Sequence, residues 1–318
     1  MNLRATFRPS LVCLAVLATV AIAAGYILSL LGIRHPPVRR VVVYTSQDQV
    51  YAEPILKEFE RQTGIQVRAV YDSEAVKTVG LVNRLLAERE HPRCDLFWNN
   101  EELRTHQLAA KGLFEQWAAV GFRSRRIAVN TNKLSLASAP KSLWELTNAT
   151  WRGKVALAYP LFGTTATHFL ALRQFWGDAR WQTWCRALAA NHPFLVDGNS
   201  VAAQLVARGE AWVGLTDSDD IAAEQREGAP IVAAPLRGES LLIPSTIGLV
   251  RGAPHGPAAE RLFDFLQRPA SVEKLVAARA LEGVSGQNVT PATLRPDWNN
   301  LLANLEAGTE SLKEIFLR

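Results

Sequence analysis

The sequence predicts an α/β protein in which helices alternate with the strands of a mainly parallel sheet. Runs rich in β-branched residues, such as "VVVYTS", are followed by segments with apolar residues at helical spacing, such as "QDQVYAEPILKEFERQTG". The chain has 318 residues, which is too long for one compact core and suits two domains. Polar residues follow several predicted strands, where parallel sheets place their ligand groups.

The first α/β unit begins after the proline-containing linker "RHPPVRR". Gly64 ends its first helix. Its expected strands are "VVVYTS", "IQVRAVY", "CDLFWNN" and "RIAVNT", and its expected helices are "QDQVYAEPILKEFERQTG", "SEAVKTVGLVNRLLAERE" and "EELRTHQLAAKGLF".

The second α/β unit begins near Trp144. Its expected strands are "GKVALAYP" and "AWVGL", and the acids of "TDSDD" close the unit. Its expected helices are "TTATHFLALRQFWGD", "ARWQTWCRALAAN", "SVAAQLVARGE" and "IAAEQREG". After this unit come a further strand, "TIGLVRG", and the helices of "HGPAAERLFDFLQRPASVEKLVAAR", which break at Pro269. Such alternation is typical of a sheet covered by helices on both faces.

Composition narrows the class of protein. A hydrophobic content of 48% supports a sizeable core, and a mean hydropathy of 0.00 argues against a protein with many membrane spans. The net charge is +5, but the basic residues are scattered, so no nucleic-acid partner is expected. We expect Cys94 and Cys185 to be buried, unpaired thiols rather than a disulfide.

The amino terminus contains an uncharged apolar segment, residues 11–33, that is long enough to cross a bilayer as a helix. One interpretation is a cleaved signal with small residues at positions 21–23. The other is an uncleaved anchor, which the return of apolar residues at positions 26–33 favours. In both cases residues 1–40 form a signal or anchor with its linker, and the rest of the chain is exported.

Three acids in "GLTDSDD" follow the predicted strand "AWVGL": Asp217, Asp219 and Asp220. Clustered oxygen ligands suit hard cations, and several carboxylates facing one cleft also suit an organic ammonium. Alternatively, Asp217 caps the next helix while the other two acids favour its positive end. If the acids are ligand groups, we expect their charge to destabilise the unliganded protein.

Two predicted helix starts carry groups that suit an anion. Gly163, Thr164 and Thr165 open one helix, and Asn199 and Ser200 open another. Free backbone N–H groups at a helix start attract anions. Ordinary capping by these side chains is the alternative interpretation.

A set of segments in constant order carries a family resemblance. They are "VVVYTS", "FERQTGIQV", "CDLFWNNE", "RSRRIAVNT", "LWELTNATWRGKVALA", "GNSVAAQLVARGEAWVGL" and "TIGLVRGAPHGPAAERLFDFLQRPASVEKL". From about Val41 to Leu275 the chain resembles the periplasmic ferric-iron-binding proteins and their wider family, the extracellular solute-binding components of ABC importers.

The resemblance implies a two-lobed periplasmic-binding-protein fold of the type II-like kind, with crossover strands as its hinge. The crossovers would lie near "RRIAVNT" and "LLIPSTIGLV". The implied lobe 1 comprises residues 41–126 and 240–285, and the implied lobe 2 comprises residues 127–239 and 286–318.

The resemblance also implies particular site residues. Ser218 and Asp219 stand where the ferric members have two adjacent ligand tyrosines. Asp48 stands at their histidine ligand, and Asn100 or Glu101 stands at their glutamate ligand.

Arg125 matches an arginine that lies near the bound anion in the resembled family, and a guanidinium binds carboxylate or phosphate through paired hydrogen bonds. Asp217 and Asp219 are the candidate metal ligands. The complete expected ligand-binding set is Thr45, Ser46, Asp48, Glu74, Asn100, Glu101, Arg125, Gly163, Thr164, Thr165, Asn199, Ser200, Asp217, Asp219 and Asp220.

The predicted function is that of a monomeric solute-binding protein that feeds the membrane permease of an ABC importer. It would act in the periplasm or at the outer face of the inner membrane, tethered there by its N-terminal segment. Ferric iron with a companion anion is the ligand that the resemblance implies, as cargo rather than as a cofactor. A zwitterion or anion such as an aminoalkyl phosphonate, or a polyamine, is the alternative.

A membrane-anchored sensor module and an enzyme are the alternatives of another class. We do not expect an enzyme, because the sequence has no G-x-S-x-G, no H-E-x-x-H, no P-loop and no glycine-rich dinucleotide fingerprint after its first strand.

Overall fold

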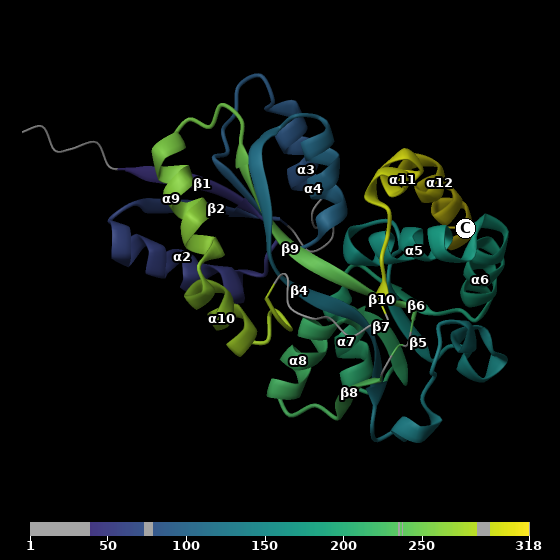
Figure 1. The fold of residues 1–318 in the computed structure, drawn as a ribbon. Helices are drawn as coiled ribbons and strands as arrows, with labels where there is room; N and C mark the ends of the chain where they lie inside the picture. Colours follow the sequence, from purple (N-terminus) through teal and green to yellow (C-terminus); the bar gives the residue numbers. More distant parts are fainter. Residues whose placement is uncertain (1–38, 73–78, 235, 237, 285–292, 318) are drawn as a thin grey trace, which may run out of the picture. The chain divides into compact units, whose positions relative to one another are not determined.

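The first part of the fold shows the predicted alternation of strands and helices (Figure 1). The computed structural model describes residues 39–72, 79–234, 236, 238–284 and 293–317. Gly64 ends the first helix in the left-handed conformation, with φ 68°. The first elements are β1 (Arg40–Thr45), α2 (Gln49–Thr63), β2 (Gln66–Tyr71), α3 (Val79–Ala87), β3 (Leu96–Asn99) and α4 (Glu102–Ala110), and β1 pairs in parallel with β2 and β3.

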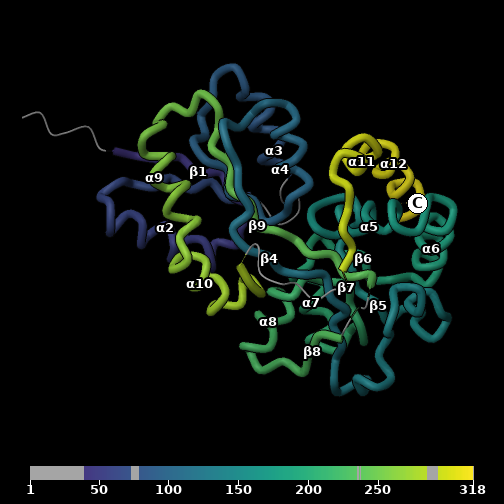
Figure 2. Tube along the Cα trace, in the orientation of Figure 1, coloured from purple at the N-terminus to yellow at the C-terminus, as the bar shows by residue number. Residues whose placement is uncertain are grey.

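Two long antiparallel strands, β4 (Phe114–Asn130) and β9 (Ser240–Val250), run side by side (Figure 2). Residues 114–124 of β4 pair with β9, whereas residues 125–130 pair with β7 (Val213–Asp217) and β8 (Ile231–Ala234). The stretch between Phe114 and Arg123, which the predicted elements left unassigned, is therefore part of one continuous strand of 17 residues. Both segments predicted as crossovers lie within these two strands.

A second group of elements surrounds β7. Here β5 (Val155–Ala158) pairs in parallel with β7 and with β6 (Phe194–Val196). The helices of this group are α5 (Gly163–Trp176), α6 (Asp178–Ala190), α7 (Asn199–Ala207) and α8 (Ser218–Arg226). The strand order is β2-β1-β3-β9-β4-β7-β5-β6, with β8 on β4 and β10 (Thr293–Leu294) on β9.

The chain then supplies α9 (Gly256–Gln267) and α10 (Pro269–Ala277), which are separated at the predicted Pro269 break. Beyond the segments that the sequence assigned lie α11 (Trp298–Ala303) and α12 (Leu305–Phe316). Short 3-10 turns connect β4 to β5 at Leu136–Ser138, Trp144–Thr147 and Ala149–Trp151.

Two main hydrophobic cores occupy the described residues. The first core contains Phe59, Trp98 and Ile247, and the second core contains Phe169, Trp181, Trp184 and Leu241. The two ends of β9 therefore belong to different cores, which is the packing that a strand crossing between lobes requires. The residue boundaries of the two lobes given above stay a prediction.

Cys94 and Cys185 are buried free thiols, as predicted. The predicted anchor at residues 11–33 lies outside the described residues. Within the described ranges, no helix combines the length and the apolar character needed to cross a membrane.

Candidate ligand-binding site

A cleft lies where β7 ends and where α5, α7 and α8 begin. Segments next to β1 and β3 form its other wall. The residues that line it are Asp48, Asn100, Arg123, Ala158, Tyr159, Phe162, Gly163, Thr164, Asp197, Gly198, Asn199, Asp217, Asp219 and Asp220. The site thus sits at the carboxyl ends of strands, where the sequence predicted it.

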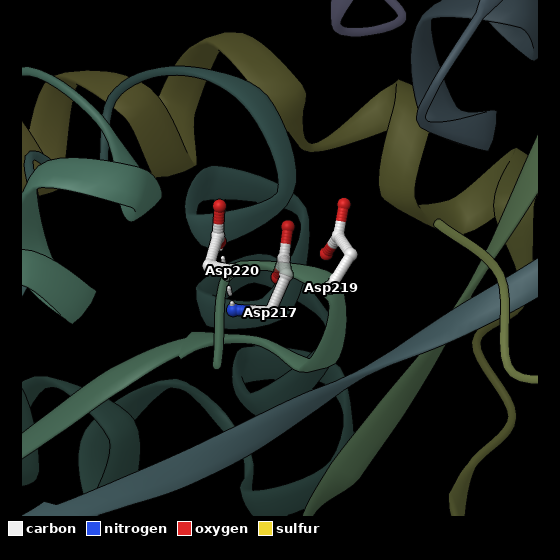
Figure 3. Close-up of side chains that lie close together, drawn as sticks. All are labelled: Asp217, Asp219 and Asp220. Carbon is white, nitrogen blue, oxygen red and sulfur yellow. Dashed lines mark hydrogen bonds between the residues drawn. The ribbon is translucent and has the colours of Figure 1, made fainter. Parts of the chain in front are cut away.

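The three acids of "GLTDSDD" line this cleft, and their side chains lie close together (Figure 3). Asp217 ends β7, and Asp219 and Asp220 belong to the first turn of α8. One carboxylate oxygen from each lies within 4.8 Å of the others. Asp220 also accepts hydrogen bonds from the Thr216 hydroxyl (2.9 Å) and from the backbone N–H of Asp217 (3.3 Å), so it supports the helix start.

The Asp217 carboxylate accepts several hydrogen bonds from buried side chains, which together form the Asp217 network. Arg125 Nη1 donates to its Oδ1 (2.6 Å), and the Thr164 hydroxyl (2.7 Å) and Arg123 Nε (3.3 Å) donate to its Oδ2. The register explains the main pair, because Arg125 stands opposite Asp217 where β4 pairs with β7. Burial would raise the pKa of Asp217, but the guanidinium groups of Arg125 and Arg123 hold it below the ordinary value.

The Asp217 carboxylate has two guanidinium partners, so its charge is compensated within the unliganded protein. Removing the carboxylate would leave buried guanidinium charge without a partner. The expected effect of the acids on the stability of the unliganded protein stays a prediction. The side chain of Asp217 is 3% exposed, and that of Arg125 is fully buried. Arg125 therefore lies behind the cleft wall and is not among the residues that line it.

Arg123 is the cation that does line the cleft. Its Nε lies 3.3 Å from Asp217 Oδ2 and 3.4 Å from Asp219 Oδ1. Burial would lower the pKa of Arg123, but the nearby carboxylates, first Asp219 and then Asp217, raise it above the ordinary value. Arg123 is absent from the predicted set, although side chains two residues apart on a strand share one face.

The two predicted anion positions have uncapped helix starts. The residues before α5 and α7, Phe162 and Gly198, make no side-chain capping bond. Thr164 donates instead to Asp217, and Thr165 donates to Asn199 Oδ1 (2.9 Å). These threonines therefore connect helix starts to the network.

Residues at the ends of the first strands form a framework behind the cleft. The Ser46 hydroxyl donates to Asn100 Oδ1 (3.0 Å) and accepts from the Asn100 backbone N–H (2.9 Å). Thr45 is buried and accepts from the backbone N–H of Gln47. Glu101 is also buried and caps α4, and burial raises its pKa.

The structure thus brings most of the predicted residues together. The predicted residues that line the cleft are Asp48, Asn100, Gly163, Thr164, Asn199, Asp217, Asp219 and Asp220. Those that do not line it are Thr45, Ser46, Glu101, Arg125, Thr165 and Ser200. Glu74 lies outside the described residues. Sequence reasoning missed Tyr159 and Asp197. Asp197 directly follows the three-residue strand β6, which was not among the predicted strands, so the strand-end argument did not reach it.

The cleft is acidic and small. Five aspartates and one arginine line it, so its surface attracts a positive centre. Its free volume is about 40 Å³, which is room for roughly three or four water molecules.

Comparison with known proteins identifies the relatives of this chain. Residues 40–278 match the family model described as bacterial extracellular solute-binding protein. The major ferric iron-binding protein of Neisseria gonorrhoeae is 24% identical over 300 residues, covering 86% of this chain and 87% of that protein. The corresponding protein of Neisseria meningitidis serogroup B is also 24% identical, with the same coverage.

Solved structures share the fold. Iron-bound HitA from Pseudomonas aeruginosa superimposes with a TM-score of 0.76 at 17% identity, covering 86% of this chain and 99% of that chain. The periplasmic binding protein AfuA from Actinobacillus pleuropneumoniae, with fructose-6-phosphate bound, gives a TM-score of 0.76 at 20% identity, covering 87% and 98%. The predicted two-lobed periplasmic-binding-protein fold is confirmed.

Proposed function

Because the chain belongs to the bacterial extracellular solute-binding protein family, which supplies the substrate-binding components of ABC importers, we propose that it captures a small solute with a positive centre. The observation that carries this proposal is the cleft lined by five aspartates and a single arginine. A positive centre gains Coulomb energy from these carboxylates. The captured solute is then delivered to a membrane permease.

Ferric iron with a companion anion is the first candidate. Asp217, Asp219 and Asp220 offer oxygen ligands within 4.8 Å of one another, and hard cations prefer such ligands. The uncapped starts of α5 and α7 suit the anion. The curated relatives in Neisseria are named as ferric iron-binding proteins.

An amine-bearing anion, such as an aminoalkyl phosphonate, is the second candidate. The Nε of Arg123 already contacts both Asp217 and Asp219, so a bare metal ion would compete with a resident guanidinium. An ammonium group can also contact Asp48 and Asp197, two further carboxylates that line the cleft. The phosphonate would occupy the helix starts.

A thermal-shift panel tests the proposed function. The panel contains ferric citrate, 2-aminoethylphosphonate, spermidine and fructose-6-phosphate, with uncharged glucose as the control. A solute at 100 times its dissociation constant stabilises the folded protein by about 2.7 kcal/mol. The expected result is a rise of several degrees in Tm with ferric citrate or 2-aminoethylphosphonate, and none with glucose. No shift with ferric citrate, 2-aminoethylphosphonate or spermidine would contradict the proposal, whether or not the anion fructose-6-phosphate raises Tm.

The N-terminal segment is proposed to tether the protein to the inner membrane. We expect the full-length chain to remain in washed membrane fractions of an expressing cell, because a single apolar span of this length is stable in a bilayer. Immunoblotting with N-terminal sequencing provides the measurement. A soluble species that begins near Ala24 would show cleavage and exclude the tether.

A further inference from the structure

The start of α11 is fixed to α5. The backbone N–H of Asp297 donates to Gln174 Oε1 (2.9 Å), and Gln174 Nε2 donates to the Asp297 carbonyl (3.4 Å). The Asp297 carboxylate also caps α11 by accepting from the N–H groups of Asn299 (3.0 Å) and Asn300 (3.2 Å). These reciprocal bonds fix the position of α11 relative to α5, which packs in the second core.

The next helix, α12, holds the same segment to the second core. Leu312 and Phe316 belong to that core, and the ring of Phe316 meets Phe169 edge to face at 5.9 Å. Gly308 packs so closely that a Cβ there would collide with Leu170 of α5. The segment 293–317 is therefore anchored through β10, α5 and α12.

The other side of α11 contacts α4, whose Leu108 packs in a cluster with residues of β1 and β3. The Trp298 indole stacks on the His106 imidazole at 5.0 Å with an interplanar angle of 19°. Leu103 of α4, Leu170 of α5 and Leu301 of α11 form a small buried cluster beside it. Hence α11, the yellow helix near α5 in Figures 1 and 2, bridges two helices from different parts of the sheet.

The two helices that α11 bridges, α4 and α5, begin at residues that line the cleft or lie close to such residues. Asn100, two residues before α4, lines one wall, and Gly163, the first residue of α5, lines the other. The Thr167 hydroxyl of α5 donates to Glu101 Oε2 beside α4 at 3.2 Å. Separating α4 from α5 would therefore separate the cleft walls.

We infer that α11 is a strap between α4 and α5, the helices that begin at the two walls of the cleft, and that Trp298 and His106 are positioning residues for solute capture. The strap is built on the α5 side and holds α4 against it, so it favours the closed arrangement of the walls. The apparent affinity of any solute that needs closure is proportional to the closed fraction, and the strap raises that fraction. The inference does not depend on which solute is bound.

Hydrogen–deuterium exchange of the full-length, ligand-free chain tests this inference. An aromatic pair contributes roughly 0.5–1.5 kcal/mol, so Trp298→Ala is expected to lower the closed-to-open ratio about two- to tenfold. Amide exchange should accelerate by that factor in peptides that cover the first turns of α7 and α8. These turns line the cleft but are not among the main packing partners of α11.

Three further variants make the result specific. His106→Ala removes the other half of the stack and should reproduce the acceleration even if Trp298→Ala folds poorly. Trp298→Phe keeps a stacking ring and should restore slow exchange. Trp144→Ala removes a tryptophan that packs on Trp176 beside the second core, and it should leave the α7 and α8 peptides unchanged. Acceleration confined to α11 and α12 in both Trp298→Ala and His106→Ala would overturn the inference.

Discussion

Replacing Asp217 with Asn is expected to lower the free energy of unfolding by about 3–5 kcal/mol, because it leaves buried guanidinium charge without its carboxylate. Asp217 accepts from Arg125, Arg123 and Thr164, and all of these side chains are buried. The measurement is urea-induced unfolding at neutral pH. A protein of ordinary stability retains little after such a loss, so the variant should also express poorly.

Asp178→Asn is the matched control for this prediction. Asp178 pairs with Arg173 at 2.5 Å, but its side chain is 49% exposed. Exposed ion pairs contribute about 1 kcal/mol or less, so this variant should unfold close to the unmodified protein. Equal losses in the two variants would show that the Asp217 network is no stronger than a surface pair.

The same network predicts a pH dependence. The pKa of folded Asp217 lies below the ordinary value of 3.8, so its ionised form stabilises the fold above that pH. This contribution is lost as the pH falls from 3.8 towards the folded pKa. The stability difference between the unmodified protein and Asp217→Asn should therefore be constant near neutral pH and shrink in acid.

Much of the fold was predictable because hydrophobic period is a local property. The switch between β-branched runs and helical spacing located β1, α2, β2 and α8 close to their observed bounds. The strand β4 was harder, because Arg123, Arg125 and Arg126 interrupt its apolar pattern. Those arginines are explained only by partners distant in sequence, such as Asp217 and Glu282.

The position of the site was predictable for a related reason. Parallel strands of one group share a carboxyl edge, so Asp48 and Asn100, which follow β1 and β3, were expected to lie close together. Asp217 ends β7, which belongs to the other parallel group and runs in the opposite direction, and it lines the same cleft. The pairing of Arg125 with Asp217 was not predictable, because it depends on the register of two strands about 90 residues apart. The hydrogen bond that holds Ser46 to Asn100 likewise depends on the register of β1 with β3.

Asp219 offers the clearest separation of binding from stability. It lines the cleft and stands 3.4 Å from Arg123 Nε, but Asp217 also pairs with that arginine. Asp219→Asn should therefore destabilise the fold less than Asp217→Asn does, because Arg123 keeps a carboxylate partner. Glu224→Gln is the matched control, since it removes one negative charge from the same helix, α8, at a residue that does not line the cleft.

The affinity of Asp219→Asn for a cationic solute is expected to fall about tenfold or more, which corresponds to roughly 1.4 kcal/mol. Isothermal titration with ferric citrate and with 2-aminoethylphosphonate provides the measurement, and Glu224→Gln should bind both as the unmodified protein does. The loss follows from removing one of the carboxylates that attract the positive centre in the cleft. A purely anionic solute such as fructose-6-phosphate should respond in the opposite sense, because the substitution removes a repulsive charge. Two results together would contradict this prediction: unchanged affinity for both cationic solutes and tighter binding of fructose-6-phosphate. They would mean that the acids act only as ion-pair partners of the arginines and that the cleft selects an anion.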